Sequence, residues 1–132
     1  KLGVIYEKGQ GVKQSQADSQ HRLGLMYGKG EGVKQDFVKA REWYLKAASQ
    51  GDADSQHALG LMYDNGEGVK QDFVKAREWY LKAAAQGHAD SQDSLGCMYH
   101  NGQGVKQDLI KAREFLLKAA AQGHVQAQNR LA

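Results

Sequence analysis

Histidines and carboxylates recur at fixed places in this sequence, and they are the first residues to consider for chemistry. His21 and His57 lie 36 residues apart, and Asp93 occupies the place a further 36 residues on. Imidazole and carboxylate groups together can bind a metal ion, and His100 is a further candidate. Packed helices have axes about 8–10 Å apart, which makes it difficult for neighbouring helices to share one ion. We therefore interpret these side chains as solvated surface residues and predict no metal and no cofactor.

Cys97 is the single cysteine of the chain, and its thiol is a possible nucleophile. A catalytic thiol needs a general base and a further group that orients the base. His100 lies three residues on and could approach the sulfur, but the sequence offers no third partner. We therefore interpret Cys97 as a small, half-buried residue and predict no catalytic residue. One cysteine also excludes an internal disulfide.

Glycine-rich segments such as Gly66-Glu67-Gly68 raise the question of a phosphate-binding loop. A P-loop would follow a strand, contain a further glycine and end in Lys-Ser or Lys-Thr, which this segment does not. The segment follows a helical pattern instead, so we expect a structural turn. Equivalent turns are expected at Gly30-Glu31-Gly32 and Gly102-Gln103-Gly104.

A repeat with a period of 36 residues positions all of these groups. Residues 31–48 and 67–84 are identical, and residues 103–120 are a looser copy. Ahead of each copy stands a short phrase, which reads Leu-Gly-Leu-Met-Tyr twice and Leu-Gly-Cys-Met-Tyr, at 95–99, the third time. A fixed period of this size is typical of stacked repeat arrays, in which each unit packs on its neighbours.

Each repeat contains two helical patterns joined by a glycine turn. In the middle repeat Asp52 is the expected N-cap of the first helix, Gly66 its left-handed C-terminal residue, and Asp72 the N-cap of the second helix. His88 and His124 stand where Asp52 stands, so we expect them to act as caps. The patterns predict an all-α fold with helices near residues 17–28, 36–49, 53–64, 72–85, 89–100, 108–121 and 125–131.

The apolar residues of the middle repeat fall on the facing sides of its two helices. Gly60 should let another helix backbone approach closely. Because Trp79 is a large apolar residue, we expect its truncation to alanine to cost about 3–5 kcal/mol. The predicted core contains Leu59, Tyr63, Ala76, Trp79, Tyr80 and Ala83.

The repeated residues include Leu-Gly-x-Met-Tyr at 59–63, Gly-x-Gly-Val at 66–69, Trp-Tyr at 79–80 and Lys-Ala-Ala at 82–84. This pattern resembles the Sel-one-like repeat, a relative of the tetratricopeptide repeat. The resemblance implies an α/α solenoid of stacked antiparallel helix pairs, wound into a right-handed superhelix, with the first helix of each repeat on the concave side. It also implies an adaptor role between proteins. Cysteine-rich relatives linked to penicillin carry a cysteine pair in each repeat, which this chain lacks.

The chain reads as a single repeat array, residues 1–132. We place repeats at 15–52, 53–88 and 89–124, and the start of a further first helix at 125–132. The chain begins with lysine and stops part-way into a repeat, so we expect it to be a fragment of a longer array.

Residues 1–14 read as a partial repeat that lacks its second helix. Leu2 precedes Leu23, its counterpart, by 21 residues rather than 36, so about 15 residues are absent after Gln14. The segment could fold back on the next repeat, pack on another chain and form a homo-oligomer, or run as one irregular helix from near Val12. A disordered stretch that was left out and numbered through would be a trivial explanation. We favour packing between chains, because the exposed end of an array tends to be covered.

Charge is mixed rather than segregated in this sequence. The chain has 18 Lys and Arg residues against 15 Asp and Glu residues, and lysines and glutamates interleave on the expected second helices. This pattern argues against nucleic acid as a partner. No apolar run approaches the length that spans a bilayer, which argues against a membrane partner. The sequence leaves the cellular compartment open.

The polar sides of successive first helices should line up as one concave strip, because every repeat presents the same face. Carboxylates and histidines would flank an apolar floor, which suits an extended peptide or a helix of a partner protein, possibly a basic one. The rivals of this non-catalytic scaffold are a cell-wall or β-lactam hydrolase and a self-associating assembly module. The strip contains Asp18, His21, Leu25, Asp54, His57, Leu61, Asp64, Asp90, Asp93, Cys97 and His100.

Overall fold

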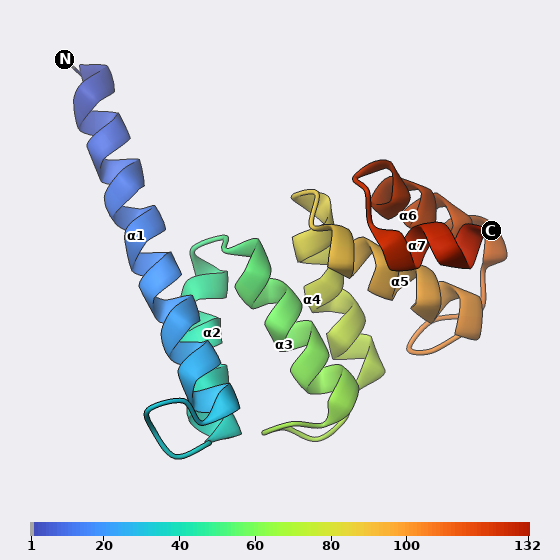
Figure 1. Ribbon diagram of the computed structural model, residues 1–132, viewed down its shortest axis with the longest axis horizontal. Helices are drawn as coiled ribbons and strands as arrows, with labels where there is room; N and C mark the ends of the chain where they lie inside the picture. Colours follow the sequence, from blue (N-terminus) through green and yellow to red (C-terminus); the bar gives the residue numbers. More distant parts are fainter. Residues whose placement is uncertain (1) are drawn as a thin grey trace.

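The computed structural model describes the backbone of residues 2–132 and the side chains of residues 14–132. Over this part of the chain it contains helices and turns and no strand, which confirms the predicted all-α class. The helices are α1 (Leu2–Lys29), α2 (Phe37–Ser49), α3 (Ala53–Asn65), α4 (Phe73–Ala85), α5 (Ala89–Asn101), α6 (Leu109–Ala121) and α7 (Val125–Leu131) (Figure 1).

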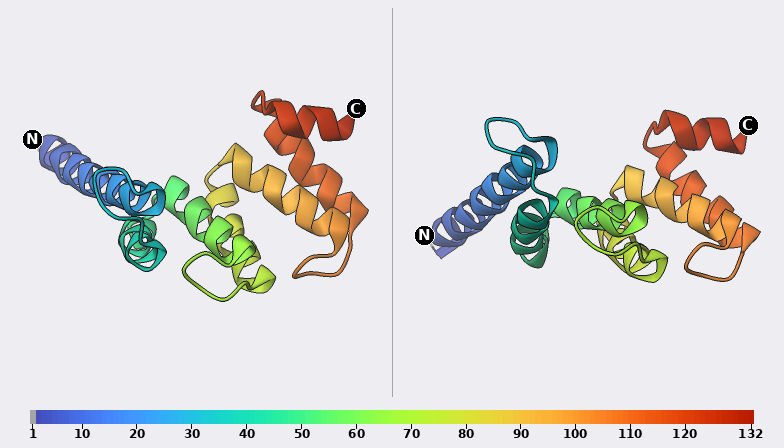
Figure 2. Two further views of the ribbon diagram at one scale, coloured as in Figure 1. Left: turned by 60° about the horizontal axis from the view of Figure 1, so that its bottom comes forward. Right: turned by 90° about the horizontal axis from the view of Figure 1, so that it is seen from below.

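The helices form a solenoid of antiparallel pairs. Helix α1 packs on α2, α3 on α4 and α5 on α6, and each pair packs on the next through α2 with α3, α4 with α5 and α6 with α7. Figure 2 shows the pairs following one another from the N-terminus to the C-terminus. In the described residues no helix is both long enough and apolar enough to cross a membrane.

The helix ends are set by the residues that the sequence indicates. The Asp52 carboxylate accepts a hydrogen bond from the backbone N–H of Ser55, and the Asp72 carboxylate accepts from Val74 and Lys75. These bonds satisfy N–H groups that the first helical turn leaves free. Gly66 ends α3 in the left-handed conformation with a φ of 70°, which a residue with a side chain adopts at a cost.

The glycine segments are turns, as predicted, and the second glycine of each also touches the preceding repeat. Gly68 has a φ of +72°, and a Cβ there would lie 2.9 Å from the backbone oxygen of Phe37 at the start of α2. Gly104 meets Phe73 in the same way one repeat later. Each turn therefore contacts the first residue of the preceding even-numbered helix.

The predicted core is correct at four of its six positions. Leu59, Ala76, Tyr80 and Ala83 are fully buried. Tyr63 and Trp79 are only partly buried and pack against the edges of the core clusters. The ring of Trp79 lies at the surface of α4, where the Lys82 ammonium group covers it at 4.5 Å from the ring centroid. We therefore expect Trp79→Ala to cost less than the 3–5 kcal/mol predicted for a core residue.

Gly60 makes room for an aromatic ring and not for a helix backbone, which corrects the expectation from the sequence. A Cβ at Gly60 would lie 2.5 Å from Cδ1 of Tyr80, in the partner helix of the same repeat. Gly24 and Tyr44 show the same relation in the first repeat. The glycine and the tyrosine therefore form one packing unit.

Helix α1 differs from the expected helix at 17–28, because it begins at Leu2 and continues without a break to Lys29. The glycines at 9 and 11 do not form a turn there. With no second helix after residue 14, the segment has nothing on which a turn could close, and the helix satisfies its backbone groups locally. The side chains of Leu2, Ile5 and Tyr6 lie outside the described residues, and packing between chains stays a prediction.

Candidate interaction groove

The odd-numbered helices share a face with exposed side chains. We call this face the groove after the predicted concave strip, and its concave shape stays a prediction. Asp18, Asp54 and Asp90 are exposed at equivalent positions of the repeat, midway along α1 and in the first turns of α3 and α5. Towards the C-terminal ends of these helices the face is more apolar. Leu61 is 40% exposed there, and Leu25 and Cys97 are half-buried at the equivalent positions of their own helices.

Histidine side chains connect neighbouring odd-numbered helices. Nδ1 of His21 lies 2.8 Å from Oγ of Ser55, and Nδ1 of His57 lies 2.7 Å from Oγ of Ser91. Both serines are fully buried. The interpretation of these histidines as solvated residues is therefore wrong. Long side chains thus bridge the gap between neighbouring helix axes by hydrogen bonds.

The two histidine caps make a second set of bridges. His88 caps α5 through Nδ1, as predicted, while its Nε2 lies 3.0 Å from Oδ1 of Asp54 in α3. His124 caps α7 in the same way and reaches Oδ1 of Asp90 at 2.7 Å. The two carboxylates remain 68% and 64% exposed, so each can still contact a partner.

The junction between α3 and α5 brings two imidazole rings together. The rings of His57 and His88 stack with their centroids 4.7 Å apart, and Ser91 contacts both histidines. Burial lowers the pKa of His57 to about 4, with His88 adding to the effect, while Asp90 and Asp54 oppose it. His57 is therefore neutral at pH 7.

Glutamines form a further ladder that the sequence analysis missed. Gln50 donates to Gln20, Gln86 to Gln56 and Gln122 to Gln92, over distances of 2.6 to 2.9 Å. Gln56 and Gln92 are buried. The spacing of 30 residues between the partners recurs in the sequence and could have revealed the ladder.

Asp93 is not a groove residue, in contrast to the prediction. It is buried in α5, where its carboxylate accepts hydrogen bonds from Nε and Nη2 of Arg130 in α7 at 3.0 and 3.4 Å. An aspartate and an arginine thus replace the histidine and serine pair of the two earlier junctions. The guanidinium compensates a carboxylate that would otherwise be costly to bury.

Two hollows open on the groove at equivalent positions. The first, of about 200 Å³, lies beside Leu25, Gly28 and Leu61. The second, of about 300 Å³, is in the third repeat and is lined by Gly96, Cys97, His100, Asn101, Leu116 and Arg130. Burial is the main cause that raises the pKa of the Cys97 thiol, which disfavours the thiolate that a nucleophile needs.

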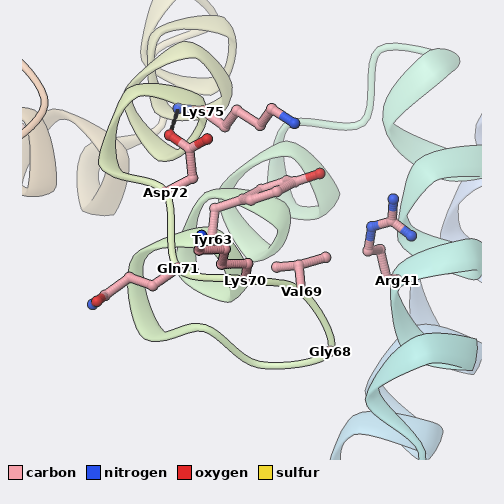
Figure 3. A pocket seen from close by; sticks show the side chains of 8 residues that line it. All are labelled: Arg41, Tyr63, Gly68, Val69, Lys70, Gln71, Asp72 and Lys75. Carbon is pink, nitrogen blue, oxygen red and sulfur yellow. Dashed lines mark hydrogen bonds between the residues drawn. The ribbon is translucent and has the colours of Figure 1, made fainter.

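A third hollow, of about 680 Å³, lies outside the groove, between α2 and the turn that joins α3 to α4. Figure 3 shows Tyr63, Val69 and the head of Lys75 facing Arg41 across it. The Asp72 carboxylate beside them is occupied in capping α4. The hollow is basic and wide open. Among the described residues, no group of three or more His, Cys, Asp or Glu side chains is placed to hold a metal ion.

The chain belongs to the Sel1 repeat family. Sel1 repeats are recognised at residues 1–17, 17–52, 53–88 and 89–124. Proteins of this family are generally scaffolds for protein–protein interaction. No curated protein sequence matches the chain.

Solved structures show the same architecture. The protective antigen c5321 of uropathogenic Escherichia coli, with an SLR fold, is 44% identical over 89% of this chain, with a TM-score of 0.86. A Sel1 repeat protein from Oxalobacter formigenes is 38% identical over 86%, with a TM-score of 0.83. The chain spans 25% and 47% of the lengths of these two proteins. Cysteine-rich protein B of Helicobacter pylori, 24% identical over 89% of this chain and 96% of its own, has the same fold with a TM-score of 0.71.

Proposed function

We propose that this chain is a non-catalytic scaffold that binds an extended segment of a partner protein along the groove. The observation that carries the proposal is the regular exposure of Asp18, Asp54 and Asp90 on one face. Carboxylates that recur once per repeat can contact basic side chains that recur along an extended chain.

The groove is held in one shape before any partner binds. The bridges from His21 to Ser55 and from His57 to Ser91 connect α1 with α3 and α3 with α5, and His88 adds a bond to Asp54. A surface that needs no rearrangement loses less free energy to ordering when it binds. This rigidity supports recognition of a flexible segment by a preformed surface.

The test removes the charge of the three groove carboxylates and leaves the bridges in place. In the variant Asp18→Asn/Asp54→Asn/Asp90→Asn, the amide oxygen can still accept the bonds from His88 and His124. The matched control Glu42→Gln/Glu78→Gln/Glu114→Gln removes three exposed carboxylates from the even-numbered helices.

Peptides of twelve residues are selected from a random display library on the natural chain, and their affinities are measured by fluorescence anisotropy. We expect basic peptides whose affinity falls about tenfold or more in the asparagine variant and is unchanged in the control. Affinity that is lost in the control and retained in the asparagine variant would place the site on the other face. A selection that enriches no peptide would overturn the proposal.

A further inference from the structure

The hollow in the third repeat lies beside Leu116, where the other two repeats have a tyrosine, and the first repeat keeps a smaller hollow of about 200 Å³ beside its Tyr44. Tyr44 packs over Gly24 and Tyr80 packs over Gly60, whereas Leu116 packs over Gly96. Leucine covers the glycine, with Cδ2 only 2.7 Å from a Cβ built there, but it lacks the outer half of the ring and the hydroxyl group.

In the middle repeat, the tyrosine hydroxyl occupies a defined polar site. Tyr80 donates a hydrogen bond of 3.0 Å to Oδ2 of Asp64, and Ser94 faces the same hydroxyl from α5. These two residues come from neighbouring odd-numbered helices. The ring therefore closes the groove between the two helices and fixes its own hydroxyl there.

The third repeat keeps this polar site with different residues. His100 stands where Asp64 stands, and Arg130 stands where Ser94 stands, each 36 residues on. Both line the hollow together with Asn101. The acceptor of the middle repeat has thus been replaced by groups that can donate to an oxygen atom.

Arg130 is held in position for such a contact. Its Nε and Nη2 bind the buried Asp93 carboxylate, so the guanidinium is fixed on one edge while the side chain remains 45% exposed. A guanidinium held in this way presents its free N–H groups and its planar face, and it attracts aromatic rings. Cys97, in place of Leu25 and Leu61, also makes the entrance less bulky, and sulfur packs well on an aromatic ring.

We propose that this hollow is a binding slot for a tyrosine side chain of the partner. The phenol ring would lie against Leu116, Gly96 and Cys97, and its oxygen would accept hydrogen bonds from Arg130 or His100. The partner would thereby supply the ring that Tyr80 supplies in the middle repeat. A volume of about 300 Å³ leaves room for the ring. An aromatic side chain in a preformed slot is a common anchor of protein interfaces. The proposal deepens the proposed function, since it names one specificity site of the groove.

The test uses small analogues, so that it does not depend on the peptide experiment. N-acetyl-tyrosinamide, N-acetyl-phenylalaninamide and N-acetyl-leucinamide are titrated into the natural chain, and amide resonances are followed by NMR. We expect shifts concentrated at Gly96, Cys97, His100 and Asn101, and an affinity for the tyrosine analogue about fivefold higher than for the phenylalanine analogue.

The variant Leu116→Tyr/His100→Asp restores the residue pair of the middle repeat and fills the slot from within. It should stay folded, because the same pair already packs at Tyr80 and Asp64. Binding of the tyrosine analogue should fall at least about tenfold. The control Leu117→Tyr adds a tyrosine at an exposed neighbouring position and should bind as the natural chain does. Arg130→Gln/Asp93→Asn, which removes the guanidinium together with the buried carboxylate that it compensates, should remove the preference for tyrosine over phenylalanine.

Two results would overturn the slot. One is equal binding of all three analogues, or none. The other is binding that survives in Leu116→Tyr/His100→Asp. If peptides bind the groove while the analogues do not bind the slot, the proposed function stands and this inference fails. If the analogues bind and no peptide does, the slot stands without the proposed function.

Discussion

Helices α2 and α4 share the sequence from Phe37 to Ala48 and from Phe73 to Ala84, and yet their surroundings differ. Tyr44 has glycine at position 28 beside it, where Tyr80 has Asp64. The helix after α2 is capped by Asp52, and the helix after α4 is capped by His88. Identical segments therefore carry different interactions. In a repeat array, the energy of a segment depends on the variable positions of its neighbours.

The two caps make the difference clearest. At the first junction the Asp52 carboxylate accepts from the Ser55 hydroxyl at 2.6 Å and lies 3.6 Å from Nδ1 of His21. At the second junction an imidazole takes the place of this carboxylate, beside His57. A carboxylate favours a protonated histidine next to it, and a second imidazole does not. One substitution at a cap thus changes the charge that lies next to the histidine of the junction.

The largest expected effect separates the two tyrosines. Tyr80→Ala should lower the free energy of unfolding by about 3–5 kcal/mol, because a fully buried ring leaves a cavity. Tyr44→Ala should cost less, since Tyr44 is slightly exposed and its hydroxyl has no carboxylate in place of Asp64. Urea denaturation followed by circular dichroism measures both. Equal losses of free energy in the two variants would show that the residues that differ around Tyr44 and Tyr80 do not affect stability.

The next effect is the acid response of the second junction. The pKa of His57 is lowered from 6.5 to about 4, so the unfolded chain binds a proton at pH 6.5 that the folded chain does not accept until about pH 4. The neutral His57 ring makes its full contribution to the free energy of unfolding above pH 6.5. This contribution is lost as the pH falls towards 4, by a total on the order of 3 kcal/mol. The measurement is the free energy of unfolding at intervals from pH 7 to pH 4.

The variant His88→Asp gives the second junction the cap of the first and sharpens this test. With a carboxylate in place of the neighbouring imidazole, the pKa of His57 should rise, and the loss of stability between pH 6.5 and 4 should shrink. NMR titration of the His57 ring reports the pKa directly. An unchanged pKa in this variant would mean that the cap does not control the junction.

A smaller effect is expected for the tyrosine hydroxyls. Tyr80→Phe should cost about 1 kcal/mol, because Asp64 loses a hydrogen bond in a partly buried place. Tyr44→Phe should cost less, since Gly28 offers no side-chain acceptor. Burial raises the pKa of both tyrosines, to about 12 for Tyr44, with Asp64 contributing for Tyr80. A matching loss in both variants would contradict the role of Asp64.

The smallest effect on stability is expected at the N-terminal end. Deleting residues 1–14 leaves the α1–α2 contacts of the described side chains in place, so the free energy of unfolding should hardly change. If residues 1–14 pack between chains, the deletion should instead lower the molecular mass of the particle in solution. Light scattering over a range of concentrations measures this mass. A strict monomer before and after the deletion would refute that packing.

The sequence predicts well what is encoded within one repeat. The period, the caps at Asp52 and Asp72 and the turn at Gly66 each follow from a few neighbouring residues, and the structure confirms them. It predicts poorly what depends on contacts between repeats. Nothing in the local pattern shows that His57 bonds to Ser91, 34 residues away, because that contact depends on the rotation of each repeat against the next.

Two errors have physical causes of the same kind. Asp93 replaces a histidine of the repeat, which predicts a place in the groove, but its partner Arg130 lies 37 residues on, in the next repeat. The predicted start of the first helix near residue 17 is wrong as well, because a glycine turn ahead of it would need a second helix on which to fold, and α1 instead continues from Leu2 to Lys29. In both cases a residue's role depends on what the next element provides.

The turns at Gly68 and Gly104 each contact a part of the chain that is synthesised earlier. Each turn rests on Phe37 or Phe73, at the start of the even-numbered helix that was synthesised before it. Proteins leave the ribosome from the N-terminus at about 5–20 residues per second, so each helix pair is complete roughly two to seven seconds before the next one. The residues that each turn contacts have therefore already been synthesised when the turn emerges, so an array that folds during synthesis adds each new repeat to the C-terminal side of the preceding ones.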